Sequence, residues 1–237
     1  MSNISFVPPS PDSEAKSLAG VAYNKIYEDI LQCQLRPGAK LGMAELQKRY
    51  QLGVGPIREA LARLSSENLV IAREQKGYRV APIDQAEIQE GLIARLVVEL
   101  GALRLSMQSR TPAWEGELLS AFHQLDRASF PDDDAQHARE WRVVHRRFHM
   151  ALLSNCGSRI LVKTAERLFD QSERSRFLRS KSLTPNSLEM IRKEHKRILN
   201  AVLDDQYDDA SKYLEQHYRR TTNDTLKTLR ANSDQTG

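Results

Sequence analysis

Residues 45–80 of the chain, ELQKRYQLGVGPIREALARLSSENLVIAREQKGYRV, decide the fold of its N-terminal part. A tight turn at 53–56 separates two helical patterns, and Pro56 is tolerated in the first turn of the second helix because an N–H there would have no intrahelical partner. From there apolar residues recur at helical spacing, at Ile57, Leu61 and Leu64. Beyond Asn68 they alternate on both sides of Gly77, which is typical of a β-hairpin. The stretch therefore predicts helix, turn, helix and a two-stranded wing.

The residues before this stretch complete the same domain. Apolar residues at helical spacing predict a first helix over 17–35, which leads to a short strand or an extended link at 40–41 and a helix over 43–50. Three helices and a wing make a winged helix-turn-helix, which we assign to residues 17–82. Residues 1–16, with three Pro and several Ser, have no apolar period and are expected to be a disordered arm.

The second domain, residues 83–237, is predicted to be entirely helical. Asp84 is a good N-cap for its first helix. Segments with a 3.6-residue period cover 84–109, 113–128, 133–155, 158–180, 185–204 and 206–231. The chain is therefore expected to be mainly α, with an all-α bundle of about six helices after the winged domain. The sequence contains neither a Gly-rich phosphate loop nor a nucleophile elbow.

Composition narrows the classes of protein that the chain can belong to. No apolar run approaches the ~18 residues of a membrane helix, so we expect a cytoplasmic protein with no membrane partner. Cys33 and Cys156 fall in different domains and are expected to be packing thiols rather than a disulfide. The net charge of +4 is uneven, since residues 36–80 hold nine Lys/Arg and four Glu, a surplus of five. That surplus favours attraction to phosphate.

Seven residues of the winged domain are candidates for contact with double-stranded DNA: Lys48, Arg49, Arg58, Arg63, Lys76, Gly77 and Tyr78. Arg58 and Arg63 leave the third helix by faces other than its apolar stripe. Surface arginines are often merely solvated, but these two follow the turn of a helix-turn-helix, whose second helix enters the major groove. The wing tip fits contact with phosphate or with the minor groove.

These motifs resemble the GntR family of bacterial transcription regulators, in its FadR-like branch with the FCD type of helical domain. The matching stretches of the N-terminal half are Leu35-Arg36-Pro37-Gly38, Pro56-Ile57-Arg58-Glu59-Ala60-Leu61, Leu64, Leu69-Val70 and Lys76-Gly77-Tyr78-Arg79-Val80. The family usually has Arg two residues before the Pro, where this chain has Val54. Base reading is therefore expected to depend more on Arg58 and on apolar contact, at an operator that differs from the family's common half-site.

In the second domain the resemblance runs through Arg95, Glu99, Phe148 and four histidines. It implies a divalent metal held by His149, His195 and His217. The family's remaining ligand is usually an Asp four residues before the first His, and here that residue is His145, so the resemblance implies a four-His variant. The stretch 141–177 looks closest to a branch represented by a glutarate-responsive carbon-starvation repressor, which implies a dicarboxylate effector such as glutarate or 2-hydroxyglutarate.

The positions of these histidines allow two interpretations. His145 and His149 share one helical face with apolar residues, and His195 and His217 lie on the apolar stripes of two further helices. Any one of them alone would be interpreted as a hydrogen-bonded core histidine. Together they favour a metal site, because four buried imidazoles would otherwise have to stay neutral without a shared partner. Imidazole ligands suit Zn, Ni or Cu better than Mg or Ca, and we expect Zn or Ni.

Arg95 and Arg176 are the candidates for binding the effector. Arg95 falls on an apolar stripe and needs an anion inside the bundle. That anion is either Glu99, one turn along the helix, in an internal ion pair, or the carboxylate of a bound effector. Arg176 shares a face with Phe169, while Arg174 points to the opposite side of the same helix. Two Arg and a metal would recognise a small acid by bidentate pairing and coordination.

One leading hypothesis and two alternatives follow. The leading hypothesis is a homodimeric transcription regulator, a repressor, whose operator binding is modulated by a small carboxylate bound near the metal. A metal-dependent enzyme fused to a DNA-binding head would need an acid or base beside the metal, and no Asp or Glu stands at ligand spacing next to His145 and His149. The second alternative, an architectural DNA-binding protein that binds no effector, would not account for the internal Arg and His residues.

Overall fold

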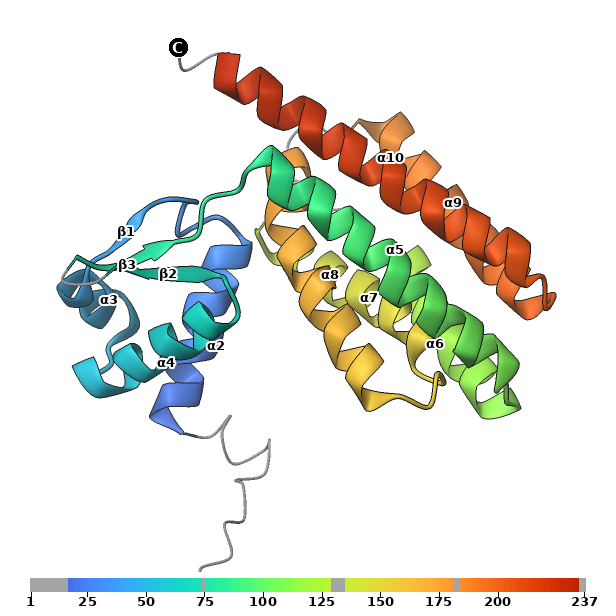
Figure 1. Ribbon diagram of the computed structural model, residues 1–237, viewed down its shortest axis with the longest axis horizontal. Coiled ribbons are helices and arrows are strands. Elements are labelled where there is room, and N and C mark those ends of the chain that lie inside the picture. Colours follow the sequence, from blue (N-terminus) through green and yellow to red (C-terminus); the bar gives the residue numbers. More distant parts are fainter. Residues whose placement is uncertain (1–16, 74–75, 129–134, 181–183, 235–237) are drawn as a thin grey trace, which may run out of the picture. The chain divides into compact units, whose positions relative to one another are not determined.

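The computed structural model of the protein describes residues 17–73, 76–128, 135–180 and 184–234 (Figure 1). These residues form two compact units, of which the first ends at Ile83 and the second begins at Asp84. The predicted arm, residues 1–16, lies outside the described residues. Each unit has its own hydrophobic core.

The first unit is a winged helix-turn-helix, as predicted. Its elements are α2 (Leu18–Leu31), β1 (Lys40–Leu41), α3 (Met43–Tyr50), α4 (Val54–Ser66), β2 (Val70–Arg73) and β3 (Gly77–Val80). The strands form an antiparallel sheet in the order β1-β3-β2, with Lys40 opposite Arg79 and Arg73 opposite Gly77. Side chains from the helices and the sheet meet in one core, among them Ile26, Leu46, Leu61 and Val80.

The first helix is shorter than its apolar pattern predicts. α2 ends at Leu31, and Cys33 takes a left-handed backbone with φ of 50°. The chain then turns back, so that the N–H of Leu35 donates to the carbonyl of Asp29 at 3.0 Å. Leu35 belongs to the core although it lies outside the helix. The apolar period extends past the end of α2 because the turn after the helix also packs a side chain, that of Leu35, into the core.

α4 starts earlier than predicted, and the wing that follows it has the predicted glycine. α4 begins at Val54, with Gly53 as its N-cap, and Pro56 is its third residue. An N–H at that position would still lack an intrahelical acceptor, so the proline costs no helical hydrogen bond. In the wing, Gly77 has φ of +76°, a left-handed conformation that favours glycine.

The second unit is helical throughout its described residues. Its six helices are α5 (Gln85–Gln108), α6 (Pro112–Arg127), α7 (Ala135–Leu153), α8 (Arg159–Ser180), α9 (Pro185–Leu203) and α10 (Tyr207–Asp234). Asp84 is the predicted N-cap of α5, and its side chain accepts from the N–H of Glu87 at 2.7 Å. In Figure 1, α5 runs beside both α8 and α10, and α10 also packs on α9 while α6 packs on α7. The predicted bundle of about six helices is confirmed.

Cys33 and Cys156 are both free, and Cys156 is buried. Within the described ranges no helix combines the length and the apolar character needed to cross a membrane.

Candidate functional site

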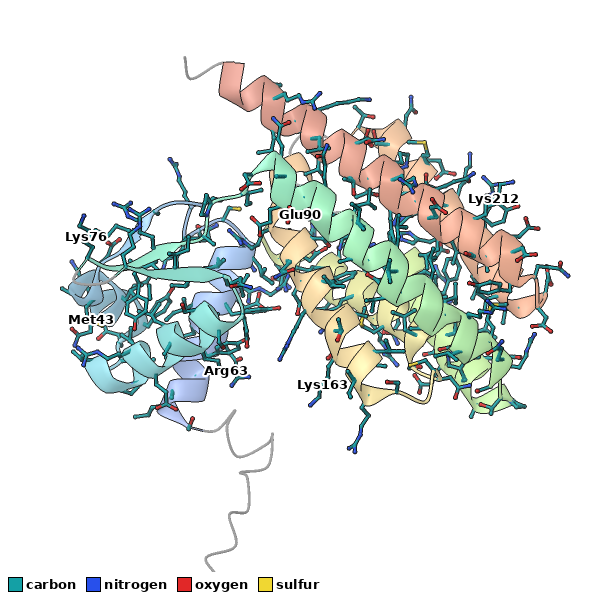
Figure 2. All side chains as sticks on the ribbon, in the orientation of Figure 1. Met43, Arg63, Lys76, Glu90, Lys163 and Lys212 are labelled. Carbon is teal, nitrogen blue, oxygen red and sulfur yellow. The ribbon has the colours of Figure 1, made fainter. Side chains whose placement is uncertain are left out.

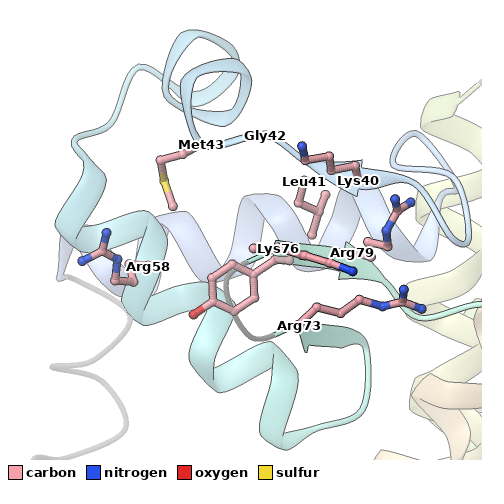
Figure 3. Close-up of a pocket in the computed structure, with 10 residues that line it drawn as sticks. Lys40, Leu41, Gly42, Met43, Arg58, Arg73, Lys76 and Arg79 are labelled. Carbon is pink, nitrogen blue, oxygen red and sulfur yellow. The ribbon is translucent and has the colours of Figure 1, made fainter.

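A groove of about 680 Å³ lies between α4, the start of α3 and the three-stranded sheet of the first unit (Figure 3). Five of the residues that line it are cationic: Lys40, Arg58, Arg73, Lys76 and Arg79. None of the ten described lining residues is acidic. Figure 3 shows Arg58 on α4, across the groove from Arg73 and Arg79 on the strands. A hollow with this charge attracts phosphate.

Part of the predicted DNA-binding set is gathered at this groove. Arg58, Lys76, Gly77 and Tyr78 line it, whereas Lys48, Arg49 and Arg63 do not. Arg49 donates to Asp29 at 2.7 Å. Arg63 lies 4.1 Å from the centroid of the Tyr23 ring and 3.5 Å from the carboxylate of Glu67. Figure 2 shows Arg63 on the side of the unit away from Lys76.

Sequence reasoning missed three cations of the groove, all of them on strands. Lys40 on β1 and Arg79 on β3 are opposite each other in the sheet, and Arg73 ends β2. Arg79 also donates to the carbonyl of Gly38 at 3.1 Å. The signal that could have found them is a basic residue in each of the three predicted strands.

The four predicted metal ligands meet in the core of the second unit. His145 and His149 come from α7, His195 from α9 and His217 from α10, and each is at most 2% exposed. One ring nitrogen of each lies within 4.8 Å of those of the others. Nε2 of His149 is 3.1 Å from Nε2 of His145 and 3.2 Å from Nε2 of His195. Three helices thus bring four imidazoles to one point.

A carboxylate outside the cluster orients His217. Nδ1 of His217 is 2.7 Å from Glu194, which also accepts from Arg220 at 2.5 and 2.6 Å. Because an ionised carboxylate only accepts, the ring proton of His217 must lie on Nδ1, which leaves the lone pair on Nε2. That Nε2 is buried and has no hydrogen-bond partner among the described residues. The arrangement is the one in which a second group holds a metal-binding histidine.

His149 is oriented in the same way through a tyrosine. The Tyr218 hydroxyl donates to Glu99 at 2.5 Å, so toward Nδ1 of His149, 3.1 Å away, it can only accept. His149 therefore carries its proton on Nδ1 and directs the Nε2 lone pair toward His145 and His195. Glu99 in turn accepts from Arg95 at 2.5 Å. A hydrogen-bonded chain thus links Arg95 to the histidine cluster.

The four imidazoles are held in the neutral form. Burial, followed by the positive groups around the cluster, lowers the pKa of His145, His149 and His195 well below the ordinary value. Burial lowers the pKa of His217 to about 4, although Glu194 opposes this shift. Neutral imidazole is the form that ligates a metal.

The described residues fit a transition-metal ion. The cluster offers neutral nitrogen donors, two of them oriented by outer groups, and Nδ1 of His145 is a second buried ring nitrogen with no hydrogen-bond partner in the described chain. An all-imidazole donor set suits Zn or Ni. Sequence reasoning missed Glu194 and Tyr218, since no spacing rule relates them to the histidines that they contact.

Arg95 forms the internal ion pair with Glu99, which was one of the two alternatives for it. Its Nε donates to Glu99 at 2.5 Å, its Nη1 donates to Ser172 at 3.3 Å, and its guanidinium lies 3.9 Å from the centroid of the Tyr218 ring. Burial lowers the pKa of Arg95, but the charge and hydrogen bond of Glu99, together with Tyr218 and Glu173, outweigh it and raise the pKa overall. The guanidinium is therefore a permanent cation inside the bundle.

Arg176 is the less satisfied of the two predicted effector residues. It pairs with Glu173 and lies 4.6 Å from the centroid of the Phe169 ring. Its buried Nε has no hydrogen-bond partner within the described residues. Burial lowers its pKa despite the opposing charge of Glu173. Arg174, which we placed on the opposite side of the helix, is also buried, with 1% of its surface exposed.

Comparison with known families finds matches over most of the chain. Residues 18–80 match the bacterial regulatory proteins of the gntR family, and residues 90–220 match the FCD domain. The first match covers the winged unit with its groove, and the second covers the helices that carry the histidine cluster. The resemblance noted from the sequence motifs is confirmed.

Three individual relatives are similar to the chain over 80% or more of their own length. The HTH-type transcriptional repressor GlaR of Escherichia coli K12 is 36% identical, over 82% of this chain and 90% of that protein. The HTH-type transcriptional regulator BphR of Paraburkholderia xenovorans is 30% identical, over 82% and 80%. The repressor RspR of E. coli K12 is 24% identical, over 90% of each.

Solved structures share the fold. E. coli McbR/YncC superposes with a TM-score of 0.75 at 21% identity, covering 90% of this chain and 99% of that one. A GntR transcriptional regulator from Rhodococcus sp. RHA1 gives 0.70 at 17% identity, covering 88% and 97%. These relatives and neighbours are transcription regulators, not enzymes, which removes the enzyme alternative.

Proposed function

The chain belongs to the GntR family of bacterial transcription regulators, with an FCD domain after its winged helix-turn-helix domain, and from this we propose that it is a homodimeric repressor controlled by a small dicarboxylate. One observation carries the proposal: in a DNA-binding family, the helical unit holds a four-histidine cluster linked by hydrogen bonds to a buried arginine. The relatives GlaR and RspR are described as transcriptional repressors, which supports the proposal that this protein represses transcription.

The DNA contact is assigned to the winged unit, residues 17–82. Arg58 projects from α4 and would read a base edge, since the second helix of a helix-turn-helix enters the major groove. Lys76, Gly77 and Tyr78 would contact phosphate or the minor groove from the wing. Lys48, Arg49 and Arg63 lie outside the groove and would contact the flanking phosphates.

The metal is assigned to the second unit, residues 83–237, with His145, His149, His195 and His217 as ligands. Zn or Ni fits these donors. The ion, when bound, would offer a Lewis-acidic contact to a ligand oxygen. Glu194 and Tyr218 keep the protons of two ligands on the outward nitrogen, so that the inward lone pairs remain available.

The effector is assigned to the arginines beside the cluster. Arg176 keeps a buried Nε donor without a hydrogen-bond partner in the described residues, and a carboxylate oxygen would satisfy it. Arg95 is close to Arg176, since the two guanidinium groups lie 5.6 and 4.6 Å from the centroid of the same Phe169 ring. Two cationic side chains and a metal suit two acid groups better than one. Glutarate or 2-hydroxyglutarate comes first by the family resemblance.

The second copy of the chain is assigned to the outer face of α5. Ile93 and Val97 are 64% and 72% exposed, and Leu105 on the same i, i+4 ridge is 39% exposed. Three large apolar side chains in a line are typical of an interaction surface rather than of a solvated helix. A twofold dimer through this face would present two winged helix-turn-helix units to a pseudo-palindromic operator.

A thermal-shift screen tests the metal and effector parts of the proposal together. The protein is purified without chelator, assayed for metal by elemental analysis, and melted in metal-free and metal-loaded form with mono- and dicarboxylates. A ligand at a hundred times its dissociation constant adds about 2.7 kcal/mol, which is a shift of a few degrees. Absence of metal, with no rise in melting temperature on adding Zn or Ni, would leave only core histidines.

A further inference from the structure

One ridge of α4 alternates apolar and cationic side chains. Val54, Arg58 and Ala62 are four residues apart, so they lie along one side of the helix, and all three are exposed. The opposite side carries Ile57, Leu61 and other residues of the core. Arg58 is therefore flanked, one turn away on each side, by a side chain that can make only apolar contacts.

Val54 stands by itself at the tip of this ridge. It is 38% exposed and is the first residue of α4. Its two neighbours are glycines, and a Cβ built on Gly55 would meet nothing within 4 Å. The backbone around Val54 is thus bare, and another molecule can approach the valine closely.

The position matters more than the exposure. Single exposed apolar residues are common and need no explanation. The N-terminal residues of a recognition helix, however, are those that contact base edges in the major groove. Val54 is therefore an apolar group at the place where a base is read.

We propose that Val54 packs against the C5-methyl group of a thymine, next to a guanine that Arg58 contacts. Valine has no hydrogen-bonding group, and in the major groove only thymine offers an apolar feature among the donors and acceptors of the four bases. A valine therefore selects T and leaves polar groups of G, A or C unpaired. The inference rests on the proposed DNA-binding function and adds to it one position of the half-site.

The experiment begins with selection of bound sequences from random double-stranded DNA by the full-length protein. The enriched half-site should contain a T next to the G that Arg58→Ala ceases to prefer. Replacing that T by deoxyuridine removes only the methyl group. The loss of affinity for wild-type protein should be about fourfold, the value of one buried methyl.

Two variants make the assignment specific to Val54. Val54→Ala should bind the T and the deoxyuridine sites alike, since it lacks the methyl groups that touch the thymine. Ile71→Ala is the matched control, because Ile71 on β2 has the same 38% exposure and is not on the ridge. It should keep the full fourfold discrimination.

The possible outcomes distinguish failure of the role of Val54 from failure of the proposed DNA-binding function. An equal loss on deoxyuridine for wild-type and Val54→Ala protein would overturn the role of Val54 while operator binding stands. A half-site with no preferred T next to that G would do the same. If no sequence is enriched over random DNA, the proposed function fails and this inference fails with it.

Discussion

At the scale of single residues, we expect Arg58 to contact a base of the operator. We expect Arg58→Ala to weaken operator binding by about 1–3 kcal/mol, the value of a bidentate base contact, while the fold stays intact because Arg58 is exposed. Binding to operator and to random DNA is measured over a range of salt. Arg36→Ala, an exposed arginine of the same unit outside the groove, is the control. Equal losses on both DNAs, with a salt slope reduced by about one, would indicate phosphate contact only.

Glu194 is a second residue whose effect can be measured alone. Glu194→Gln removes the charge that holds the His217 proton on Nδ1, and we expect metal affinity to fall roughly 10–100-fold. Competition with a chromophoric chelator measures it. Asp224→Asn is the matched control, because Asp224 also pairs with Arg220, at 3.1 Å, but lies seven residues beyond His217 on α10. If both variants bind metal as the wild type does, Glu194 does not orient a ligand.

At the scale of elements, the exposed ridge of α5 is expected to hold the dimer together. Val97→Glu places a charge in its centre, and burying an unpaired charge at an interface is strongly unfavourable. We expect a dimer in the wild type and a monomer in the variant by light scattering, with unchanged helical content. Leu119→Glu on α6, also at an exposed apolar residue, should remain dimeric. A dimeric Val97→Glu protein would move the interface elsewhere.

At the scale of the whole molecule, we expect the proposed effector to weaken operator binding. A dicarboxylate that releases DNA has to bind the DNA-free arrangement better, and the same coupling, typically 1–3 kcal/mol, must appear when operator weakens the dicarboxylate. Titrating glutarate into metal-loaded protein with and without operator measures this directly. Arg176→Met should abolish glutarate binding but not operator binding. Equal glutarate affinity in the two titrations would exclude the switch even if the acid binds tightly.

The sequence by itself determined the features that depend on neighbours within about one helical turn. Asp84 as an N-cap, Gly77 in a left-handed turn and the inward faces of α4 and α7 all follow from local spacing, because the backbone geometry of a helix or hairpin imposes that spacing. For the same reason the four histidines could be placed on inward faces, and Arg95 could be paired with Glu99, one turn away.

Only the tertiary structure decided which of these faces meet. Glu194 contacts His217 across 23 residues and Tyr218 contacts Glu99 across 119, and no local period relates such pairs. These contacts set the tautomers of two imidazoles and connect the buried arginine to the cluster. In the winged unit, the pairing of β1 with β3 brought Lys40 and Arg79 to the groove. Helix and strand periods determine where a side chain points, whereas its partner depends on the packing of elements distant in the chain.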